Sequence, residues 1–418
     1  MIPFKQGVKG REFFDYLFDR QALLHYLGEQ PKDKEIMLLL FELEDLDEWF
    51  SVYAPNVVTK AGEEILKIID EILPSESKFF QLCDDKYCIV FSDTDARRGM
   101  EFAHILKALI IERKSCTNLS EVDVMIASGV AIGRVESIIP KVFSALKMAK
   151  KLFSKIYFLD VSDEVFKEEQ NKEISYNALI KDAVQQGKII PFYQPIYDNK
   201  IKKVTKFECL ARLIDNQNNR VLYPFDFLAQ VRRMGFMRSI TFSIINHSFK
   251  TFAKNDLEFS INITEEDLRD TQMIDYLRNR SQKYQINPQR IIIELLEDIE
   301  FDDDDLIINN ILILKDMGFK IAVDDFGYAN SNFGRLIKMQ IDYIKIDGRF
   351  IKNMDTNPIS QKIVRSVTEF AKNIGVQCIA EHIHSKATQN LAEKFGIEFS
   401  QGYFIGEAIS NPHLEAKD

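Results

Sequence analysis

Acidic and amide side chains stand where apolar segments end in the second half of the chain, a pattern that could bind metal ions. The clearest case is the pair Asp324 and Asp325, which closes the apolar segment 321–323 and precedes a Phe-Gly turn. Such a segment is typical of a buried parallel strand, and the carboxyl ends of parallel strands meet at one edge. Polar residues end or follow other apolar segments at Glu208, Asn262, Glu294, Lys345, Asp347, Glu381 and Gln401. The sequence therefore predicts one rim of oxygen ligands.

The chemistry of this rim points to phosphate ester hydrolysis. Oxygen ligands without a Cys or His set favour Mg²⁺ or Mn²⁺ over zinc. Two adjacent carboxylates, Asp324 and Asp325, are suited to two metal ions about 3.5–4 Å apart, which can activate water and stabilise a leaving phosphoryl oxygen. Lys345 could neutralise the charge that develops on phosphorus or orient the water. Arg212, four residues after Glu208, could bind a phosphate through two hydrogen bonds.

Each of these residues also has a structural explanation. Strand-end acids commonly cap the next helix, and this accounts for any single acid as well as metal binding does, but not for the whole set. Arg212 alone would suit a surface ion pair, whereas Lys345 in an apolar segment is costly to bury without a partner. We interpret His382 and His384 as rim or loop residues, and the acidic run 302–305 as the first turn of a helix.

The elements that must position the rim alternate between strand and helix from residue 189 onward. The predicted strands are 189–197, 202–211, 258–263, 290–296, 320–325, 342–346, 376–381 and 398–404. Amphipathic segments such as 305–317, 358–374 and 385–395 predict helices between them. Ligands on so many strands favour a TIM-type (β/α)₈ barrel over an open doubly wound sheet. Only a few residues join the first two strands, which predicts a hairpin and hence one antiparallel strand.

The length and composition predict two domains in a soluble intracellular protein. We predict a smaller α+β domain over residues 1–160, with a hairpin over 78–91. We predict a charged helical connector over residues 161–178 and the barrel over residues 179–418. The net charge of −10 does not favour a nucleic-acid polymer. Five cysteines without a paired framework suit a reducing compartment, and neither a signal peptide nor a membrane-spanning run is evident. We therefore expect a cytoplasmic protein.

Taken together, the barrel motifs resemble the EAL family of cyclic-di-GMP phosphodiesterases. The likeness covers about residues 179–418, and its eight motifs occur in the family's order. They are Tyr193-Gln-Pro-Ile196, Glu208-Cys-Leu210 with Arg212, Asn262, Glu294-Leu-Leu-Glu297, Asp324-Asp-Phe-Gly327, Lys345-Ile-Asp347, Ala380-Glu381 and Gln401-Gly-Tyr403. The resemblance implies a (β/α)₈ barrel with one antiparallel strand and opening of one phosphodiester to give linear pGpG.

The resemblance also implies a role for each matched residue. The ligands of the first Mg²⁺ or Mn²⁺ ion would be Glu208, Asn262, Glu294 and Asp324. The second metal site would be shaped by Asp324, Asp325 and Glu381. The hydrolytic water would be assisted by Lys345, with Gln401 nearby. The cyclic dinucleotide would be contacted by Gln194, Leu210, Arg212 and Gln401. Glu297 would anchor the loop after Asp325.

This chain departs from the family pattern beside the site. The segment 328–331 has Ala329 where a glycine is usual, His384 replaces an acid, and the proline expected within 404–409 is absent. These changes leave open an alternative, a non-catalytic receptor that binds cyclic-di-GMP and signals to a protein partner. A purely structural interaction protein would leave the acidic set unexplained.

The first half resembles a GGDEF cyclase domain more faintly, through 15–20, 62–66 and 83–87. Cys83 and Asp84 replace the paired glycines of its signature, and Lys86 inverts the charge of the second acid. We therefore expect a catalytically inactive domain that regulates the barrel or dimerises, and the resemblance suggests a homodimer.

Overall fold

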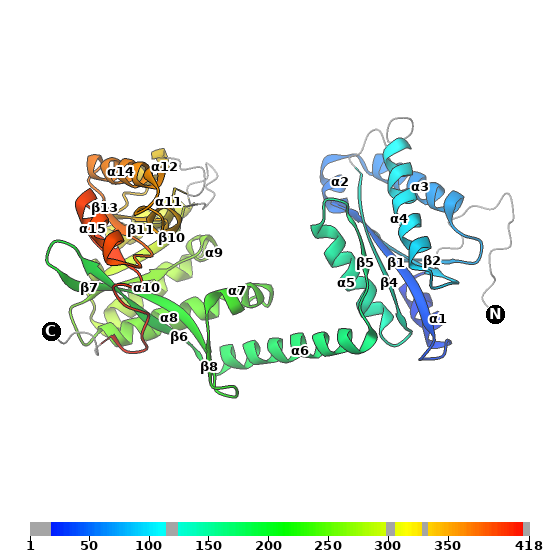
Figure 1. Ribbon diagram of the computed structural model, residues 1–418, viewed down its shortest axis with the longest axis horizontal. Coiled ribbons are helices and arrows are strands. Elements are labelled where there is room, and N and C mark those ends of the chain that lie inside the picture. Colours follow the sequence, from blue (N-terminus) through cyan, green and yellow to red (C-terminus); the bar gives the residue numbers. More distant parts are fainter. Residues whose placement is uncertain (1–17, 114–123, 298–305, 328–332, 413–418) are drawn as a thin grey trace. The chain divides into compact units, whose positions relative to one another are not determined.

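The computed structural model describes residues 18–113, 124–297, 306–327 and 333–412, and the chain forms two compact units (Figure 1). The first unit comprises Met1–Ile174 and the second Ser175–Asp418. Among the residues described, no helix is long and apolar enough to cross a membrane.

The first unit is built around a five-stranded sheet in the order β2-β3-β1-β4-β5. Its strands are β1 (Glu35–Glu44), β2 (Lys78–Cys83), β3 (Lys86–Phe91), β4 (Met125–Arg134) and β5 (Ile156–Leu159). The predicted hairpin is present as β2 and β3, which pair antiparallel, whereas β4 and β5 are parallel. Its helices are α1 (Arg20–Gly28), α2 (Leu46–Val52), α3 (Pro55–Ile72), α4 (Ala96–Arg113) and α5 (Ile138–Lys151).

Strand β1 shows why this unit has helices on both faces of the sheet. Alternate side chains of a strand point to opposite faces. Accordingly, Met37 and Leu39 join one buried cluster with residues of α3 and α4, and Leu38 and Leu40 join another with residues of α1 and α5. The sheet is thus buried on both sides.

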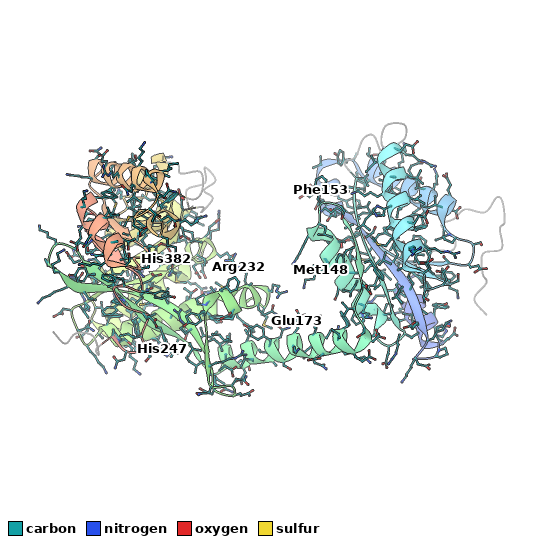
Figure 2. The ribbon with its side chains drawn as sticks, viewed as in Figure 1. Met148, Phe153, Glu173, Arg232, His247 and His382 are labelled. Carbon is teal, nitrogen blue, oxygen red and sulfur yellow. The ribbon has the colours of Figure 1, made fainter. Side chains whose placement is uncertain are left out.

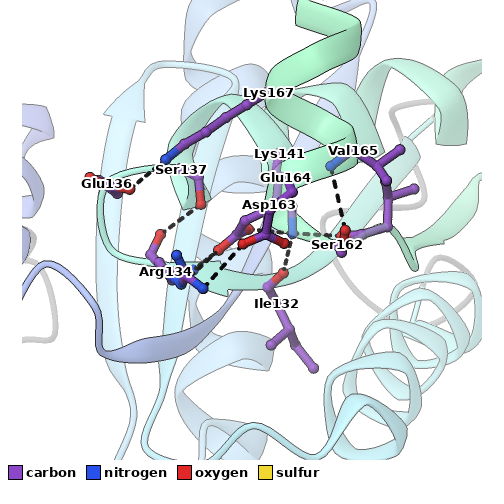
Figure 3. A network of polar contacts seen from close by, with 11 residues as sticks. Ile132, Arg134, Glu136, Ser137, Lys141, Ser162, Asp163, Glu164, Val165 and Lys167 are labelled. Atoms are coloured by element: carbon purple, nitrogen blue, oxygen red, sulfur yellow. Dashed lines mark hydrogen bonds and ion pairs between the residues drawn. The ribbon is translucent and has the colours of Figure 1, made fainter.

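Helix α6 (Asp163–Gln185) starts at a buried ion pair in the first unit (Figure 3). The Nζ atom of Lys141 on α5 lies 2.6 Å from Oδ1 of Asp163, and both side chains are buried. Lys141 also donates to the carbonyl oxygens of Ile132 at 3.0 Å and Val161 at 2.7 Å. The backbone N–H of Arg134 donates to Oδ2 of Asp163 at 2.9 Å. These contacts fix the first turn of α6 to the sheet.

The second unit is a closed eight-stranded barrel, as predicted. Its strands are β6 (Ile189–Asp198), β7 (Lys203–Asp215), β9 (Glu258–Asn262), β10 (Ile291–Leu296), β11 (Lys320–Phe326), β12 (Tyr343–Ile346), β13 (Gln377–Ala380) and β14 (Phe399–Gln401). Strand β6 pairs antiparallel with both β7 and β14, and the other barrel pairs are parallel. The β6–β7 pairing closes the sheet and excludes the open doubly wound alternative. The short strand β8 (Arg220–Leu222), which was not predicted, extends β7 into a second hairpin.

Helices lie around the barrel strands (Figure 1), and apolar side chains pack between the helices and the strands. The helices are α7 (Pro224–Arg233), α8 (Met237–Phe252), α9 (Glu265–Arg269), α10 (Thr271–Tyr284), α11 (Leu306–Asp316), α12 (Phe333–Lys338), α13 (Gly348–Ile351), α14 (Pro358–Asn373) and α15 (Lys386–Phe395), with a 3₁₀ turn at Pro288–Arg290. Phe252 of α8 stacks on Phe259 of β9 with ring centroids 4.5 Å apart. A separate buried cluster that includes Ile292, Tyr343 and Phe399 lies near the amino ends of the strands. The carboxyl ends are left to carry polar residues.

Candidate active site

The carboxyl ends of the barrel strands bring together residues that were predicted to act at one site. Strand β7 carries Glu208, β9 ends at Asn262, and β10 carries Glu294. Strand β11 carries Asp324 and β12 carries Lys345. Glu381 follows the last residue of β13, and Gln401 ends β14. Because these strands are parallel neighbours, residues distant in sequence become adjacent in space.

Lys345 lies at the centre of this site. Its Nζ atom is 3.0 Å from carboxylate oxygens of Glu294, Asp324 and Glu381, and 3.3 Å from Oε2 of Glu208. Its side chain is only 1% exposed. A buried ammonium is tolerated only where anions and hydrogen bonds compensate for lost hydration, and the four carboxylates supply that compensation. Lys345 therefore lies within a concentration of negative charge at the carboxyl ends of the strands.

One ammonium does not neutralise four carboxylates, so the acids differ in their affinity for protons. Burial opposes the ionisation of Glu208, but Lys345 and two side-chain amides outweigh it and lower its pKa to about 2. Burial and the neighbouring Glu208 raise the pKa of Glu294 well above its ordinary value. Burial raises the pKa of Glu381 to about 8, although Lys345 opposes the shift. Burial disfavours the charged form of Lys345, yet the surrounding carboxylates raise its pKa well above the ordinary value.

Two amide side chains orient Glu208. Asn262 donates through Nδ2 to Oε1 of Glu208 at 3.0 Å, and Gln401 donates through Nε2 to Oε2 at 2.6 Å. The same Gln401 nitrogen lies 3.2 Å from Oε1 of Gln194, the residue opposite Glu208 on β6. These contacts leave the carbonyl oxygen of Asn262 as its candidate metal ligand.

The acidic residues form two groups that could each hold a metal ion. Glu208, Glu294 and Asp324 make the first group, and Asp324, Asp325 and Glu381 make the second. Within each group the candidate ligand atoms lie within 4.8 Å of one another. Because Asp324 belongs to both groups, its carboxylate is placed to bridge two ions.

Two buried oxygen atoms at the site support a fit to a hard cation. Oε1 of Glu294 and Oε1 of Gln401 are inaccessible to solvent and accept no hydrogen bond from the described residues. A buried polar atom without a partner is costly, and a bound cation would satisfy it. The all-oxygen donor set is the one that Mg²⁺ and Mn²⁺ prefer.

A backbone irregularity explains how adjacent acids reach the same group. Side chains of consecutive strand residues normally point to opposite faces. The pairing of β11 with β12 shifts between Val323 and Phe326, and Asp325 has a left-handed φ of 54°. This bulge turns the carboxylate of Asp325 toward that of Asp324. Burial and then the Asp324 charge raise the pKa of Asp325.

Three of the four predicted substrate-binding residues lie on the β6–β7 hairpin, and the fourth, Gln401, ends β14. Leu210 and Gln194 are partly buried, and Gln194 Nε2 lies 3.4 Å from the carbonyl oxygen of Gly406. Arg212 is buried, and its guanidinium lies over the ring of Tyr223, with Cζ 4.5 Å from the ring centroid. Tyr223 was missed in the sequence because it follows the unpredicted strand β8.

Two further acids of the rim have structural contacts: Glu297 binds a backbone N–H of the turn after β11, and Asp347 caps a helix. Oε2 of Glu297 accepts a hydrogen bond from the backbone N–H of Gly327 at 3.1 Å, immediately before the segment 328–331, which lies outside the described residues. Asp347 caps α13 by accepting the N–H of Arg349 at 2.7 Å, so the structural explanation applies to this acid.

His382 and His384 lie beyond the end of β13, which is Ala380. His382 (labelled in Figure 2) has a left-handed φ of 50°, so the chain turns there and the two imidazoles do not share one strand face. Both side chains are exposed, as expected for rim or loop residues. The acidic run 302–305 lies outside the described residues, and α11 begins at Leu306.

The closed barrel and its lysine-centred acidic rim define a TIM-type protein with a candidate binuclear metal site. The sequence model of the EAL domain matches residues 178–408, which is more than half of the chain, so the chain belongs to the EAL domain family.

Similar proteins support this assignment. A probable cyclic di-GMP phosphodiesterase, PdeA of Escherichia coli K12, is 30% identical over 59% of this chain and 34% of that protein. Cyclic di-GMP phosphodiesterase PdeB of Shewanella oneidensis is 25% identical over 93% of this chain and 47% of that protein. The crystal structure of an EAL domain protein from Listeria monocytogenes EGD-e has the same fold, with a TM-score of 0.51 and 24% identity over 56% of this chain and 93% of that chain. The chain thus spans about a third to a half of the length of these two curated relatives.

Proposed function

We propose that the barrel is a cyclic-di-GMP phosphodiesterase that needs two Mg²⁺ or Mn²⁺ ions and releases linear pGpG. The observation that carries this proposal is Lys345 enclosed by four carboxylates at the strand ends, of which those of Glu208 and Glu294 are buried. Such a cluster is costly to the fold and is the ligand set that a phosphoryl-transfer centre requires. The names of the curated relatives supply the substrate.

In the proposed reaction a water oxygen bonds to one phosphorus, the bond from phosphorus to the ribose 3′ oxygen breaks, and that oxygen takes up a proton. When bound, the two divalent ions would activate the water and stabilise the leaving oxygen. Their ligands would be Glu208, Asn262, Glu294, Asp324, Asp325 and Glu381. Lys345 keeps its proton beside the carboxylates, so its ammonium can donate to the attacking water or to phosphoryl oxygens.

Residues around the metal ligands would bind the substrate or hold the ligands in position. Arg212 would bind a phosphate group, and Gln194 and Leu210 would contact the nucleotide. Gln401 orients Glu208 from β14. Glu297 would hold the start of the loop that follows Asp325, through the hydrogen bond that it accepts from the N–H of Gly327.

We further propose that residues 1–160 form an inactive GGDEF-like domain that regulates the barrel, with 161–178 as connector. At the tip of the β2–β3 hairpin, Nζ of Lys86 lies 3.5 Å from Oε2 of Glu42 and also pairs with Asp85. Lys150 donates to the other oxygen of Glu42 at 2.7 Å. Lysines therefore pair with acids at the place where the cyclase signature would lie, which supports the loss of cyclase chemistry. Homodimerisation and a cytoplasmic location stay predictions.

Incubation of the purified chain with cyclic-di-GMP and Mg²⁺ or Mn²⁺, followed by chromatography, tests the proposal. Linear product that disappears with a chelator and with Glu208→Ala is expected. Tight binding without product in either metal would contradict hydrolysis and support the receptor alternative.

A further inference from the structure

Arg212 is a buried cation without a carboxylate partner among the described residues. It is 7% exposed, and its Nη1 donates to the carbonyl oxygen of Ala211 at 2.9 Å. Burial lowers its pKa, as expected where a charge has lost water. A guanidinium is costly to bury without an anion, so this arrangement suits a site whose anion arrives with a ligand.

The ring of Tyr223 lies against this cation. The two residues are neighbours because Leu213 of β7 pairs with Leu222 of β8, the last pair of this hairpin, and Arg212 and Tyr223 are the residues adjacent to that pair. The Cζ atom of Arg212 is 4.5 Å from the centroid of the Tyr223 ring and 5.9 Å from that of Phe192. Both distances are within the range of cation–π attraction.

The start of α7 fixes the backbone of Tyr223. Pro224 follows it, which disfavours helical dihedrals, and Tyr223 is extended with φ −90° and ψ 162°. Its N–H donates to Oδ2 of Asp226 at 2.9 Å. The carbonyl oxygen of Asp226 in turn accepts the hydroxyl of Tyr176 on α6 at 2.6 Å. These hydrogen bonds hold the backbone of Tyr223 in place, although the residue is 55% exposed.

We propose that Tyr223 is a positioning residue for substrate binding: its ring holds the guanidinium of Arg212 in place to bind a phosphate group of cyclic-di-GMP. An aromatic face attracts the cation without neutralising it, whereas a carboxylate at this position would compete with the phosphate. The other N–H groups of Arg212 donate to no described residue, which leaves them for two parallel hydrogen bonds to phosphate oxygens. This inference rests on the proposed phosphodiesterase function.

Steady-state kinetics of the full chain separate positioning from folding. Tyr223→Ala is expected to raise KM for cyclic-di-GMP by about 3- to 30-fold with little change in kcat, since the lost attraction acts on binding. Tyr223→Phe keeps the aromatic face and should stay within about threefold of wild-type KM. The matched control is Phe225→Ala, because Phe225 is 96% exposed two residues further on. An unchanged KM for Tyr223→Ala, or equal damage by Tyr223→Phe, overturns the proposal.

A double-mutant cycle shows whether the effect passes through Arg212. In an Arg212→Ala background, Tyr223→Ala should add no further increase in KM. An additive increase would mean that Tyr223 acts on the substrate independently, and it overturns the positioning role.

An NMR measurement tests the contact without turnover. In protein labelled with ¹⁵N-arginine, the Nε–Hε signal of Arg212, assigned with Arg212→Lys, should shift in Tyr223→Ala because the ring current is lost, and should shift much less in Tyr223→Phe. An unshifted signal overturns the positioning role even in a chain that hydrolyses cyclic-di-GMP. A shifted signal in a chain that neither binds nor hydrolyses the dinucleotide overturns instead the proposed function, and with it the phosphate role.

Discussion

Replacement of Lys345 by methionine should destabilise the metal-free barrel strongly and the metal-loaded barrel much less. Methionine keeps most of the side-chain length but removes the cation that pairs with Glu208, Glu294, Asp324 and Glu381, the only one that does so among the described residues. Removing one partner of a buried ion pair costs about 3–5 kcal/mol. For a unit of this size 1 kcal/mol corresponds to about 2–4 °C, so the melting temperature should fall by about 6–20 °C in a chelator.

Divalent cations should then restore stability, because they bind the same carboxylates. A ligand at 100 times its Kd adds about 2.7 kcal/mol, which recovers most of the loss. Turnover should nevertheless stay low with metal present, since Lys345 would no longer donate to water or phosphate. Thermal melts with chelator and with Mn²⁺, alongside hydrolysis assays, measure both effects.

Lys206→Met is the matched control for this experiment. Lys206 is also a buried barrel lysine, and its Nζ lies 3.0 Å from Oε2 of Glu258, the first residue of β9 and thus at the other end of the strands. Its loss should lower the melting temperature without changing the increase that Mn²⁺ produces. A Lys345→Met protein that melts like wild type in chelator, or that metal stabilises no more than it stabilises wild type, would refute the account of the charge cluster.

Three further outcomes are expected. Burial raises the pKa of Glu381 to about 8, so a proton must leave this carboxyl group when metal binds near pH 7. Mn²⁺ affinity measured by calorimetry should therefore rise from about pH 6 to about pH 8, and Glu381→Gln should flatten the rise. A wild-type affinity that does not depend on pH would count against this role of Glu381. Glu297→Ala removes the acceptor of the Gly327 N–H and should lower turnover or metal affinity about 10- to 100-fold. If the variant keeps wild-type turnover and wild-type metal affinity, this hydrogen bond is dispensable. Lys141→Met leaves Asp163 buried without its cation and should lower the free energy of unfolding by about 3–5 kcal/mol. Urea unfolding measures this loss through the fluorescence of the single tryptophan, which is buried in the first unit. An unshifted unfolding transition would argue against a role for this ion pair in stability.

Most of the barrel could be predicted from the sequence because apolar runs and their polar ends recur at each strand. The segment 320–325 ends on two acids and is observed as β11 over Lys320–Phe326. The short strand β8 was missed because Arg220–Leu222 is three residues long and lacks a periodic pattern of its own. Tyr223 was missed with it, since its contact with Arg212 depends on that pairing.

The site was predictable in its residue types but not in its geometry. Motif order identifies Lys345 as a functional candidate, yet only closure of the sheet surrounds it with four carboxylates. Adjacent acids on an ideal strand would diverge, and the bulge that turns Asp325 toward Asp324 has no signal in the sequence. Asp347 looked like its neighbours in sequence, but it caps α13 because the chain turns there.

Hydrolysis of cyclic-di-GMP in ¹⁸O-labelled water tests the central claim most directly. With Mn²⁺ or Mg²⁺, the wild-type chain should form linear pGpG that carries one heavy oxygen on its terminal phosphate, detected by mass spectrometry. Chelator and Glu208→Ala should each abolish the product. Failure to form pGpG with either metal, or equal formation in chelator, would contradict a two-metal phosphodiesterase at this site.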